Sequence, residues 1–426
     1  MRSFRIVSRR HGCRAWLSRR STISALHLGS SRRAFRPIGL LMLVALAIGA
    51  PAAQAQDSVA TLIARIEGAQ PVPASAADSV SLAALMERFN VPGVSVAVIK
   101  DFRVHWARSY GVADRETGRP VLPNTPFQAA SISKPVTAMA ALRLVQDGKL
   151  QLDGDINTVL RSWRIPVTDL NRTRPVTARA LFSHTSGADD GFGFPGYDPG
   201  APLPTMPQLL DGQAPSNVKA VLFARPAFQQ YKYSGGGLSI MQLALTELTG
   251  KPFAALLQSM VLGPLGMSES SFEQPPSAAY AARVARAHSL QGRRPIAPYH
   301  IYPEQAAAGL WTTPGDLARY VIEVQLASLG GAGKVLTPAL AREMVTPVGV
   351  GPFAVGLTVE KRGEGWYFSH GGANWGFRAN IIGHLRKGYG LVVMTNSDNG
   401  GQLIREIEQR VAAAYQWDSL DKPLRR

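Results

Sequence analysis

Residues 129–137 read AASISKPVT, which places a serine three residues before a lysine at the start of a stretch with helical character. Residues three apart lie on one face of a helix, so we expect the side chains of Ser131 and Lys134 to meet within one turn, with Pro135 still tolerated there. A serine hydroxyl needs a neighbouring base, but a lysine is normally protonated at pH 7. Burial and positive dipoles can bring a lysine pKa to about 7, at a cost of roughly 4.6 kcal/mol. The stretch fits either a serine nucleophile with a lysine base or a capping serine beside an exposed lysine.

Other catalytic templates fit this chain less well. Residues 191–196 match the pattern G-x-G-x-x-G, but they contain a proline and follow a polar loop instead of a strand. The nucleophile pattern G-x-S-x-G does not occur, and the eight histidines lack the spacing of a zinc site. We therefore expect no metal ion and no cofactor.

The first 55 residues have the pattern of an export signal. Basic residues precede an apolar run at 38–50, and Ala53-Gln54-Ala55 fits a signal-peptidase site. The alternative of a membrane anchor is disfavoured because the apolar run is shorter than the roughly 20 residues that a spanning helix needs. We predict a signal peptide over 1–55, a mature start at Gln56, no stable membrane anchor after leader removal, and a periplasmic or secreted location. Arg32-Arg33 fits either the twin-arginine export route or a chance pair.

This leader also accounts for most of the charge and for the cysteine. The formal net charge is +17, but residues 1–55 hold ten arginines and no other charged residue, and the remainder holds 36 basic and 29 acidic residues. No dense basic run remains, so we expect no nucleic-acid partner. The only cysteine, Cys13, lies in the leader, so the predicted mature chain has no disulfide.

Strand patterns occur near both ends of the predicted mature chain, with helical patterns between them. Residues 91–112 read as two strands joined by a turn at Lys100-Asp101. Strand character returns within 365–398, and the chain closes on a helix with Leu403, Ile407 and Val411 on one side. Thr313-Pro314-Gly315-Asp316 is a strong helix start.

These patterns predict an α/β (α+β) fold. We expect an antiparallel sheet flanked by helices, built from both chain ends, with an inserted and mostly helical domain. The predicted ranges are 56–84 for an N-terminal spacer and first helix, 85–140 and 326–426 for the sheet domain, and 141–325 for the helical domain.

Six stretches in order add a family resemblance. They are FQAASISKPVTAMAALRLVQDGKLQLDGDI, ARALFSHTSG, YKYSGGGLSIMQLALTELTGKPF, VLGPLGMSES, AAAGLWTTPGDLARY and SHGGANWGF. Together they resemble the serine β-lactamase and D-alanyl-D-alanine carboxypeptidase superfamily, in particular its class C β-lactamase-like branch, which includes esterases. The resemblance spans roughly residues 85–415 and implies the β-lactamase/transpeptidase-like fold.

The resemblance implies a catalytic role for each matching residue. Ser131 would be the acylated nucleophile, Lys134 its base and Tyr233 a proton relay. With two cationic neighbours, Tyr233 would ionise well below its usual pKa of about 10 and form one coupled base with Lys134. His370-Gly371-Gly372 would take the place of the family's K-T-G strand in substrate binding, and the N–H groups of Ser131 and Ala373 would form the oxyanion hole.

Three positions bear on the substrate and on alternative mechanisms. Gly235 replaces the family asparagine that donates to a substrate acylamide, a bond worth about 1 to 3 kcal/mol. His370 replaces the lysine typical of β-lactamases. Both changes favour small esters or amides over β-lactams. His184, in the stretch HTSG, is expected to be structural and not part of a Ser-His-Asp triad.

The sequence therefore predicts a secreted serine hydrolase that forms an acyl-enzyme on Ser131. Its partner would be a small-molecule ester, amide or β-lactam substrate. The alternatives are a β-lactamase, a D-Ala-D-Ala carboxypeptidase, and a penicillin-binding sensor that is acylated without turnover.

Overall fold

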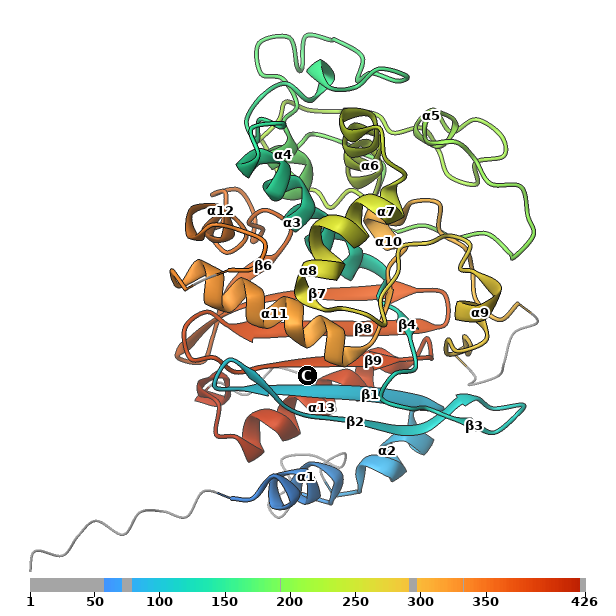
Figure 1. The fold of residues 1–426 in the computed structure, drawn as a ribbon, viewed down its shortest axis with the longest axis vertical. Coiled ribbons are helices and arrows are strands. Elements are labelled where there is room, and N and C mark those ends of the chain that lie inside the picture. The colour runs from blue at the N-terminus through green and yellow to red at the C-terminus, as the bar shows by residue number, and fades with distance from the viewer. Residues whose placement is uncertain (1–56, 71–78, 192, 291–296, 332, 422–426) are drawn as a thin grey trace, which may run out of the picture. The chain divides into compact units, whose positions relative to one another are not determined.

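The central sheet takes strands from both ends of the chain (Figure 1). We describe a computed structural model over residues 57–70, 79–191, 193–290, 297–331 and 333–421; the predicted signal peptide and its cleavage site lie outside the described residues. The sheet has seven strands in the order β3-β2-β1-β9-β8-β7-β6, and every neighbouring pair whose register is given is antiparallel. The strands are β1 (Gly93–Lys100), β2 (Arg103–Asp114), β3 (Arg119–Pro120), β6 (Thr358–Arg362), β7 (Gly365–Asn374), β8 (Phe377–His384) and β9 (Gly390–Thr395). The predicted fold class is confirmed.

Strand β1 lies at the centre of this sheet because its side chains are apolar on both faces. Residues 93–99 are all buried, which is typical of a strand that is covered on both sides. β1 pairs with β2, its neighbour in sequence, and with β9 from the far end of the chain, where Val96 lies opposite Val393. Joining β1 to β9 is what closes one sheet from two distant segments.

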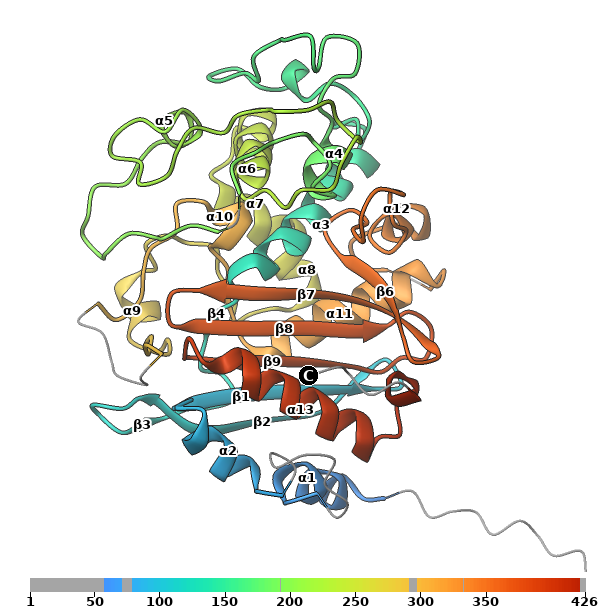
Figure 2. The ribbon, with the colours of Figure 1, turned by 180° about the vertical axis from the view of Figure 1, so that it is seen from behind.

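Helices cover both faces of the sheet. Figure 2 shows α13 (Gly400–Ala414) lying across one face, where it contacts β8 and β9. Beside it lie α1 (Val59–Glu67) and α2 (Leu82–Arg88), and the buried guanidinium of Arg410 on α13 donates to backbone carbonyls around both of these helices. On the opposite face, α11 (Pro314–Ser328) contacts β1, β8 and β9.

The start of α11 follows the predicted capping pattern. The Thr313 hydroxyl accepts from the N–H of Asp316 at 3.3 Å, and Pro314 occupies the first turn, where a missing N–H does no harm. Most of this element falls within the residues predicted for the helical domain, yet it packs on the sheet. The predicted domain ranges stay predictions.

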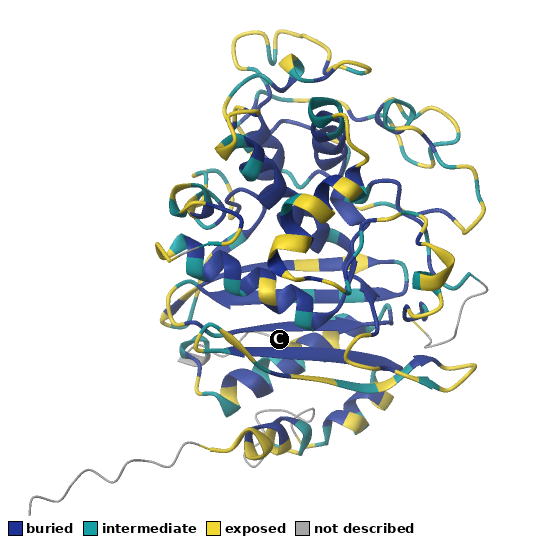
Figure 3. Ribbon diagram, in the orientation of Figure 1, coloured by how far each residue is buried: buried dark blue, intermediate teal, exposed yellow. Residues whose placement is uncertain are grey.

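A mostly helical layer follows β2 and β3 in sequence and holds two buried helices. In α3 (Ser133–Gln146), residues 133–142 are all buried, as are the first ten residues of α6 (Gly236–Thr249), and Figure 3 shows both helices in dark blue. Helices buried on every side do not show the single apolar face of an amphipathic surface helix. The other described α-helices and strands of this part are β4 (Phe127–Gln128), α4 (Ala178–Phe182), α5 (Met206–Leu210), α7 (Phe253–Leu257), α8 (Gly263–Leu265), α9 (Ala278–Ala281), α10 (Gln305–Ala308), β5 (Trp311–Thr312) and α12 (Pro338–Glu343).

None of the helices in the described part of the chain combines the length and the apolar character that crossing a bilayer requires.

Candidate active site

Ser131 lies in a short 3-10 turn, η1 (Ala130–Ile132), that leads directly into α3. The preceding residue, Ala130, has φ +51°, a left-handed conformation that costs a non-glycine residue roughly 1 kcal/mol or more. Two hydrogen bonds hold the turn: the Ser133 hydroxyl donates to the carbonyl of Ala130 (2.6 Å) and accepts from the N–H of Leu310 (2.9 Å). Strain of this kind persists where surrounding contacts over-determine it, and such positions cluster at functional sites.

Lys134 meets Ser131 as the spacing predicts. Its Nζ donates to Ser131 Oγ at 2.9 Å and to the carbonyl oxygen of Ala307, in α10, at 2.8 Å. The lysine is 2% exposed, and this burial lowers its pKa to about 7, against the opposing influence of the Asp190 carboxylate. A large fraction of this amine is therefore neutral near pH 7 and able to accept a proton.

Tyr233 lies just before α6 and forms a hydrogen bond with the Ser131 side chain. Its ring centre is 5.1 Å from Lys134 Nζ. Burial raises the pKa of Tyr233, so the expectation that it ionises below its usual value is wrong. The physical reason is that removal from water disfavours the charged phenolate, and this outweighs the hydrogen bond from Ser131. His370 supplies no charge to offset it, because burial lowers its pKa to about 3.

His184 packs against Tyr233 and also binds the residue that follows it in the chain. Its ring stacks on Tyr233 with centroids 4.1 Å apart, and its Nδ1 accepts from the N–H of Ser234 at 3.2 Å. Burial lowers the pKa of His184 well below its usual value, so the ring is neutral. These contacts agree with a structural role, which stays a prediction.

The second half of β7 lies against the turn that carries Ser131. A Cβ on Gly372 would come within 2.1 Å of the Ala129 carbonyl oxygen, so only glycine fits where the strand passes the turn. His370 hydrogen-bonds through Nδ1 to the Gly371 carbonyl (2.7 Å). Ala373 lines the same cavity as Ser131; the predicted pairing of their N–H groups in an oxyanion hole stays a prediction.

A cavity of about 880 Å³ is lined by the predicted residues Ser131, Tyr233, His370, Gly371, Gly372 and Ala373, but not by Lys134, His184 or Gly235. Tyr231 and Phe353 form an aromatic wall, with ring centroids 5.7 Å apart. Four basic side chains line it as well: Lys361, Arg362, Arg378 and Arg405.

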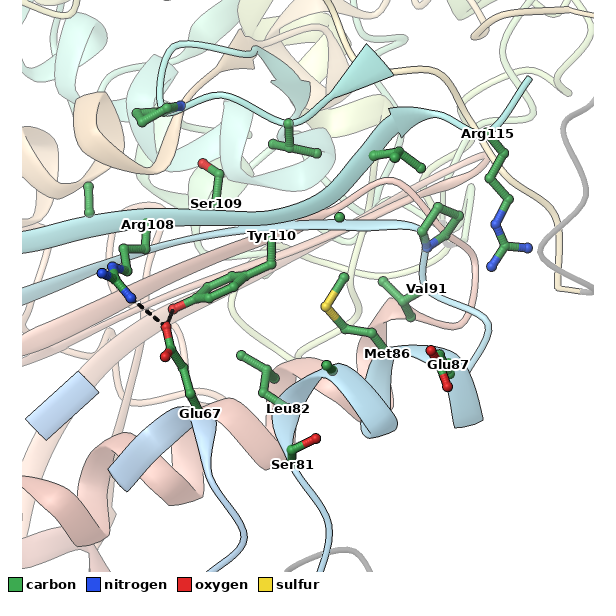
Figure 4. A pocket seen from close by; sticks show the side chains of 17 residues that line it. Glu67, Ser81, Leu82, Met86, Glu87, Val91, Arg108, Ser109, Tyr110 and Arg115 are labelled. Carbon is green, nitrogen blue, oxygen red and sulfur yellow. Dashed lines mark hydrogen bonds and ion pairs between the residues drawn. The ribbon is translucent and has the colours of Figure 1, made fainter. Parts of the chain in front are cut away.

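A second cavity of about 860 Å³ shows that size does not identify the site. It lies between α2 and strand β2, and Figure 4 shows Arg108 and Tyr110 directed at Glu67, to which they donate at 2.7 and 3.0 Å. Among the described residues that line this cavity there is no lysine or histidine to activate its serines, Ser81 and Ser109. Of these two cavities, the first is the one in which a described serine lies beside a buried base.

Two residues of the loop before α5 belong to the site and were not predicted. Asp190 accepts from the Ser234 hydroxyl (2.5 Å) and from the N–H of Gly236 (2.7 Å). Phe194 lies against Gly235. The glycine run at 235–237 was the available signal, because consecutive glycines indicate close approach of other groups, but it does not say which groups approach.

Within the described residues, no group of three or more His, Cys, Asp or Glu side chains is arranged to hold a metal ion.

Comparison with known proteins gives matches in sequence and in fold. Residues 81–416 match the protein family described as Beta-lactamase. Esterase EstB of Burkholderia gladioli is 29% identical over 320 residues, which cover 69% of this chain and 78% of EstB. A structure of SurE with D-Leu superposes with a TM-score of 0.63 at 25% identity, covering 81% of this chain and 75% of SurE. D-amino acid amidase from Ochrobactrum anthropi SV3, in complex with L-phenylalanine amide, has a TM-score of 0.63 at 21% identity, covering 83% of this chain and 98% of the amidase.

Proposed function

Because the chain belongs to the Beta-lactamase family, we propose that it is a serine hydrolase that cleaves small carboxylic esters or amides through an acyl-enzyme on Ser131. The observation that carries the proposal is the buried contact of 2.9 Å between Ser131 Oγ and a lysine amine whose pKa is about 7. A serine beside a neutral amine is an activated nucleophile.

In the acylation step, neutral Lys134 accepts the Ser131 proton while Oγ bonds to the substrate carbonyl carbon. The N–H groups of Ser131 and Ala373 bind the negative oxygen of the tetrahedral intermediate. As the intermediate collapses, the bond to the leaving alcohol or amine breaks, and that group takes a proton. Tyr233 suits this transfer because its raised pKa keeps it a neutral phenol: it donates its own proton and regains one from Lys134.

In the deacylation step, a water molecule attacks the acyl carbonyl, and its proton passes to neutral Lys134, either directly or through Tyr233, which accepts one proton as it donates its own. The bond to Ser131 Oγ breaks, and the serine recovers a proton. The products are a carboxylic acid and the free enzyme, so the whole reaction consumes one water for each ester or amide bond.

Three observations favour esters and simple amides over β-lactams. Gly235 has no side chain to bind a substrate acylamide, and His370 is neutral, so it supplies no positive charge for a substrate carboxylate. EstB, with which this chain shares 29% identity, is named as an esterase.

A β-lactamase or D-Ala-D-Ala carboxypeptidase activity is the second candidate. It is favoured by the basic side chains in the cavity, among which Arg405 is exposed, because β-lactams and such peptides carry a carboxylate.

Covalent labelling tests the nucleophile. Intact-protein and peptide mass spectrometry after treatment with an alkyl fluorophosphonate should find one adduct, on the peptide that contains Ser131, and none in Ser131→Ala. Ser109→Ala is the matched control, because it removes a serine from the other large cavity and should label normally. An adduct on another residue, or full hydrolysis by Ser131→Ala, contradicts the mechanism.

A parallel kinetic screen tests the substrate class. A chromogenic short-chain ester should turn over faster than a cephalosporin or a D-Ala-D-Ala peptide. Fast cephalosporin hydrolysis would favour the β-lactamase, and stoichiometric acylation by penicillin without product release would favour the sensor.

The proposed location is periplasmic or secreted, on the basis of the leader pattern in residues 1–55. Exported protein should begin at about Gln56 by N-terminal sequencing, and an intact arginine-rich N-terminus on exported material would contradict this.

A further inference from the structure

The loop that carries Asp190 and Phe194 is built around Gly235. Asp190 binds the two neighbours of this glycine, the Ser234 hydroxyl at 2.5 Å and the Gly236 N–H at 2.7 Å. Phe194 covers the glycine itself, since a Cβ there would lie 2.7 and 2.8 Å from two ring carbons. These separations are shorter than any ordinary carbon–carbon contact, so the ring takes the space that a side chain at 235 would need.

The backbone that follows Phe194 is anchored, which fixes the position of the ring. Tyr197 and Ile301 exchange two backbone hydrogen bonds, of 2.9 and 2.7 Å. The carbonyl of Pro195 bonds to His300 Nδ1 at 2.8 Å. Phe194 is half-buried and packs against the main hydrophobic core, so its ring has little freedom to leave.

The same loop is connected to the strand end that carries the predicted oxyanion residue. The His300 ring stacks on Trp375 with centroids 3.9 Å apart and planes within 4°. Trp375 follows Ala373 by two positions, directly after β7. Phe194 is therefore held by groups that also fix the neighbourhood of the oxyanion hole.

We propose that Phe194 is a specificity-determining residue that selects simple alkanoyl or aroyl groups and rejects acyl groups with an amide at the α-carbon. This inference deepens the proposed hydrolase function and rests on it. Gly235 is two residues from Tyr233, which hydrogen-bonds to Ser131, and the Phe194 ring fills the place of a side chain at 235, so a substrate amide that reaches this position meets an apolar surface. A substrate amide placed there loses its hydration without gaining a partner, which is unfavourable, whereas an alkyl chain gains contact area.

The inference predicts what an asparagine at position 235 would do. The backbone at Gly235 is ordinary for any residue, with φ −76° and ψ −42°, so the obstacle is the ring alone. Gly235→Asn by itself must displace Phe194 and cannot supply a productive donor. The acylamide hydrogen bond requires Gly235→Asn together with Phe194→Ala.

Two esters that differ only in the amide test the proposal. The p-nitrophenyl esters of pentanoic acid and of N-acetylglycine have acyl chains of equal length and the same leaving group. We expect the unmodified enzyme to prefer pentanoate in kcat/KM. Phe194→Ala should reduce that preference about tenfold, and the double variant should reduce it about tenfold again. Gly235→Asn alone should lower kcat/KM for both esters.

Two further variants separate specificity from folding. Phe89→Ala truncates another half-buried phenylalanine, which packs on the other core cluster near α2, and should leave the preference unchanged. Phe194→Leu keeps most of the apolar bulk and should give an intermediate preference if Phe194→Ala does not fold.

The outcomes distinguish this inference from the proposed function. If intact mass shows acylated Ser131 but the preference stays within twofold in every Phe194 variant, Phe194 does not set specificity and the hydrolase proposal stands. If neither ester acylates Ser131 in the unmodified enzyme, the proposed function fails and this inference fails with it.

Discussion

At the scale of single residues, the candidate site depends on burial changing which groups are charged. Lys134 has a pKa of about 7 and His370 of about 3, while the pKa of Tyr233 is raised. Near neutral pH, the Lys134 amine therefore exchanges its proton, while the His370 imidazole and the Tyr233 phenol stay neutral. Each shift follows from removal of water, since desolvation disfavours whichever form carries charge.

This arrangement predicts how activity depends on pH. Lys134 acts as a base only when neutral, so kcat/KM for a chromogenic ester should fall about tenfold per pH unit below about 7 and level off above it. Lys134→Arg keeps a permanent positive charge and should lower kcat/KM by about 10² to 10⁴. Lys149→Ala, which removes an exposed lysine three residues past the end of the same helix, is the control. A flat profile between pH 5 and 9 would exclude Lys134 as the base.

Glu304 predicts a separate dependence of stability on pH. Both its carboxyl oxygens are buried without a hydrogen-bond partner in the described structure, and burial raises its pKa to about 8. The folded state therefore keeps a proton that the unfolded state releases above about 4.5. Its contribution to stability is fully present below pH 4.5 and is lost as the pH rises toward 8.

Replacing Glu304 with glutamine tests the predicted direction of this pH dependence of stability. Glu304→Gln is neutral at every pH, so urea unfolding should show a smaller loss of stability between pH 5 and 8 than the unmodified protein, by up to roughly 4 kcal/mol. The exposed Glu364→Gln should keep the original slope. An unchanged slope in Glu304→Gln would mean that Glu304 is ionised in the folded protein.

The sequence predicted the parts of the site that depend on short spacing. Ser131 and Lys134 are three residues apart, and a helical turn alone brings them together. Asp190 and Ser234 are 44 residues apart, and nothing in a loop rich in glycine, proline and aspartate indicates their contact. The pKa of Tyr233 was mispredicted for the same reason, because burial is set by tertiary packing that residue spacing does not contain.

At the scale of elements, one buried arginine joins three helices. Arg410 on α13 donates to the carbonyls of Ile66, Gly68 and Val80, at 3.2, 2.9 and 2.7 Å. The first two belong to the C-terminal end of α1, where a positive group also interacts favourably with the helix dipole. The Arg410 side chain thus connects α13 to the end of α1 and to the segment just before α2.

Removing that guanidinium should loosen the N-terminal helices. Arg410→Met leaves one buried and two partly buried carbonyls without this donor and should destabilise the protein by about 3 kcal/mol, measured by urea unfolding. Limited proteolysis should cut first between residues 57 and 90. Arg405→Met, on the exposed side of the same helix, should leave stability unchanged. Equal effects of the two substitutions would contradict the role given to Arg410.

At the scale of the whole molecule, the helical layer and the sheet meet at Ser131, the predicted nucleophile. The turn η1 contacts β7 and β8 of the sheet as well as α10. The sequence predicted this sheet because alternating and continuous apolar runs are local signals, and it predicted the start of α11 from its cap. It did not place α11 on the sheet, since a helix pattern does not say which surface will cover it.

Shared contacts at the nucleophile predict cooperative unfolding. Residues 57–421 should lose far-ultraviolet circular dichroism, tryptophan fluorescence and esterase activity at one temperature, because neither layer keeps its buried surface without the other. Two separated transitions would show instead that the helical layer is independently stable.

The pairing of β1 with β9 sets the order of events during synthesis. Val96 leaves the ribosome nearly 300 residues before Val393, its neighbour in the finished sheet. Until then the exposed edge of the β1–β2 hairpin is open to wrong partners, a hazard of sheets that join distant segments. Ser131 and Lys134 also emerge long before Ala373. A nascent chain therefore carries Ser131 and Lys134 long before it carries Ala373, so the two N–H groups of the predicted oxyanion hole can come together only after β7 has been made.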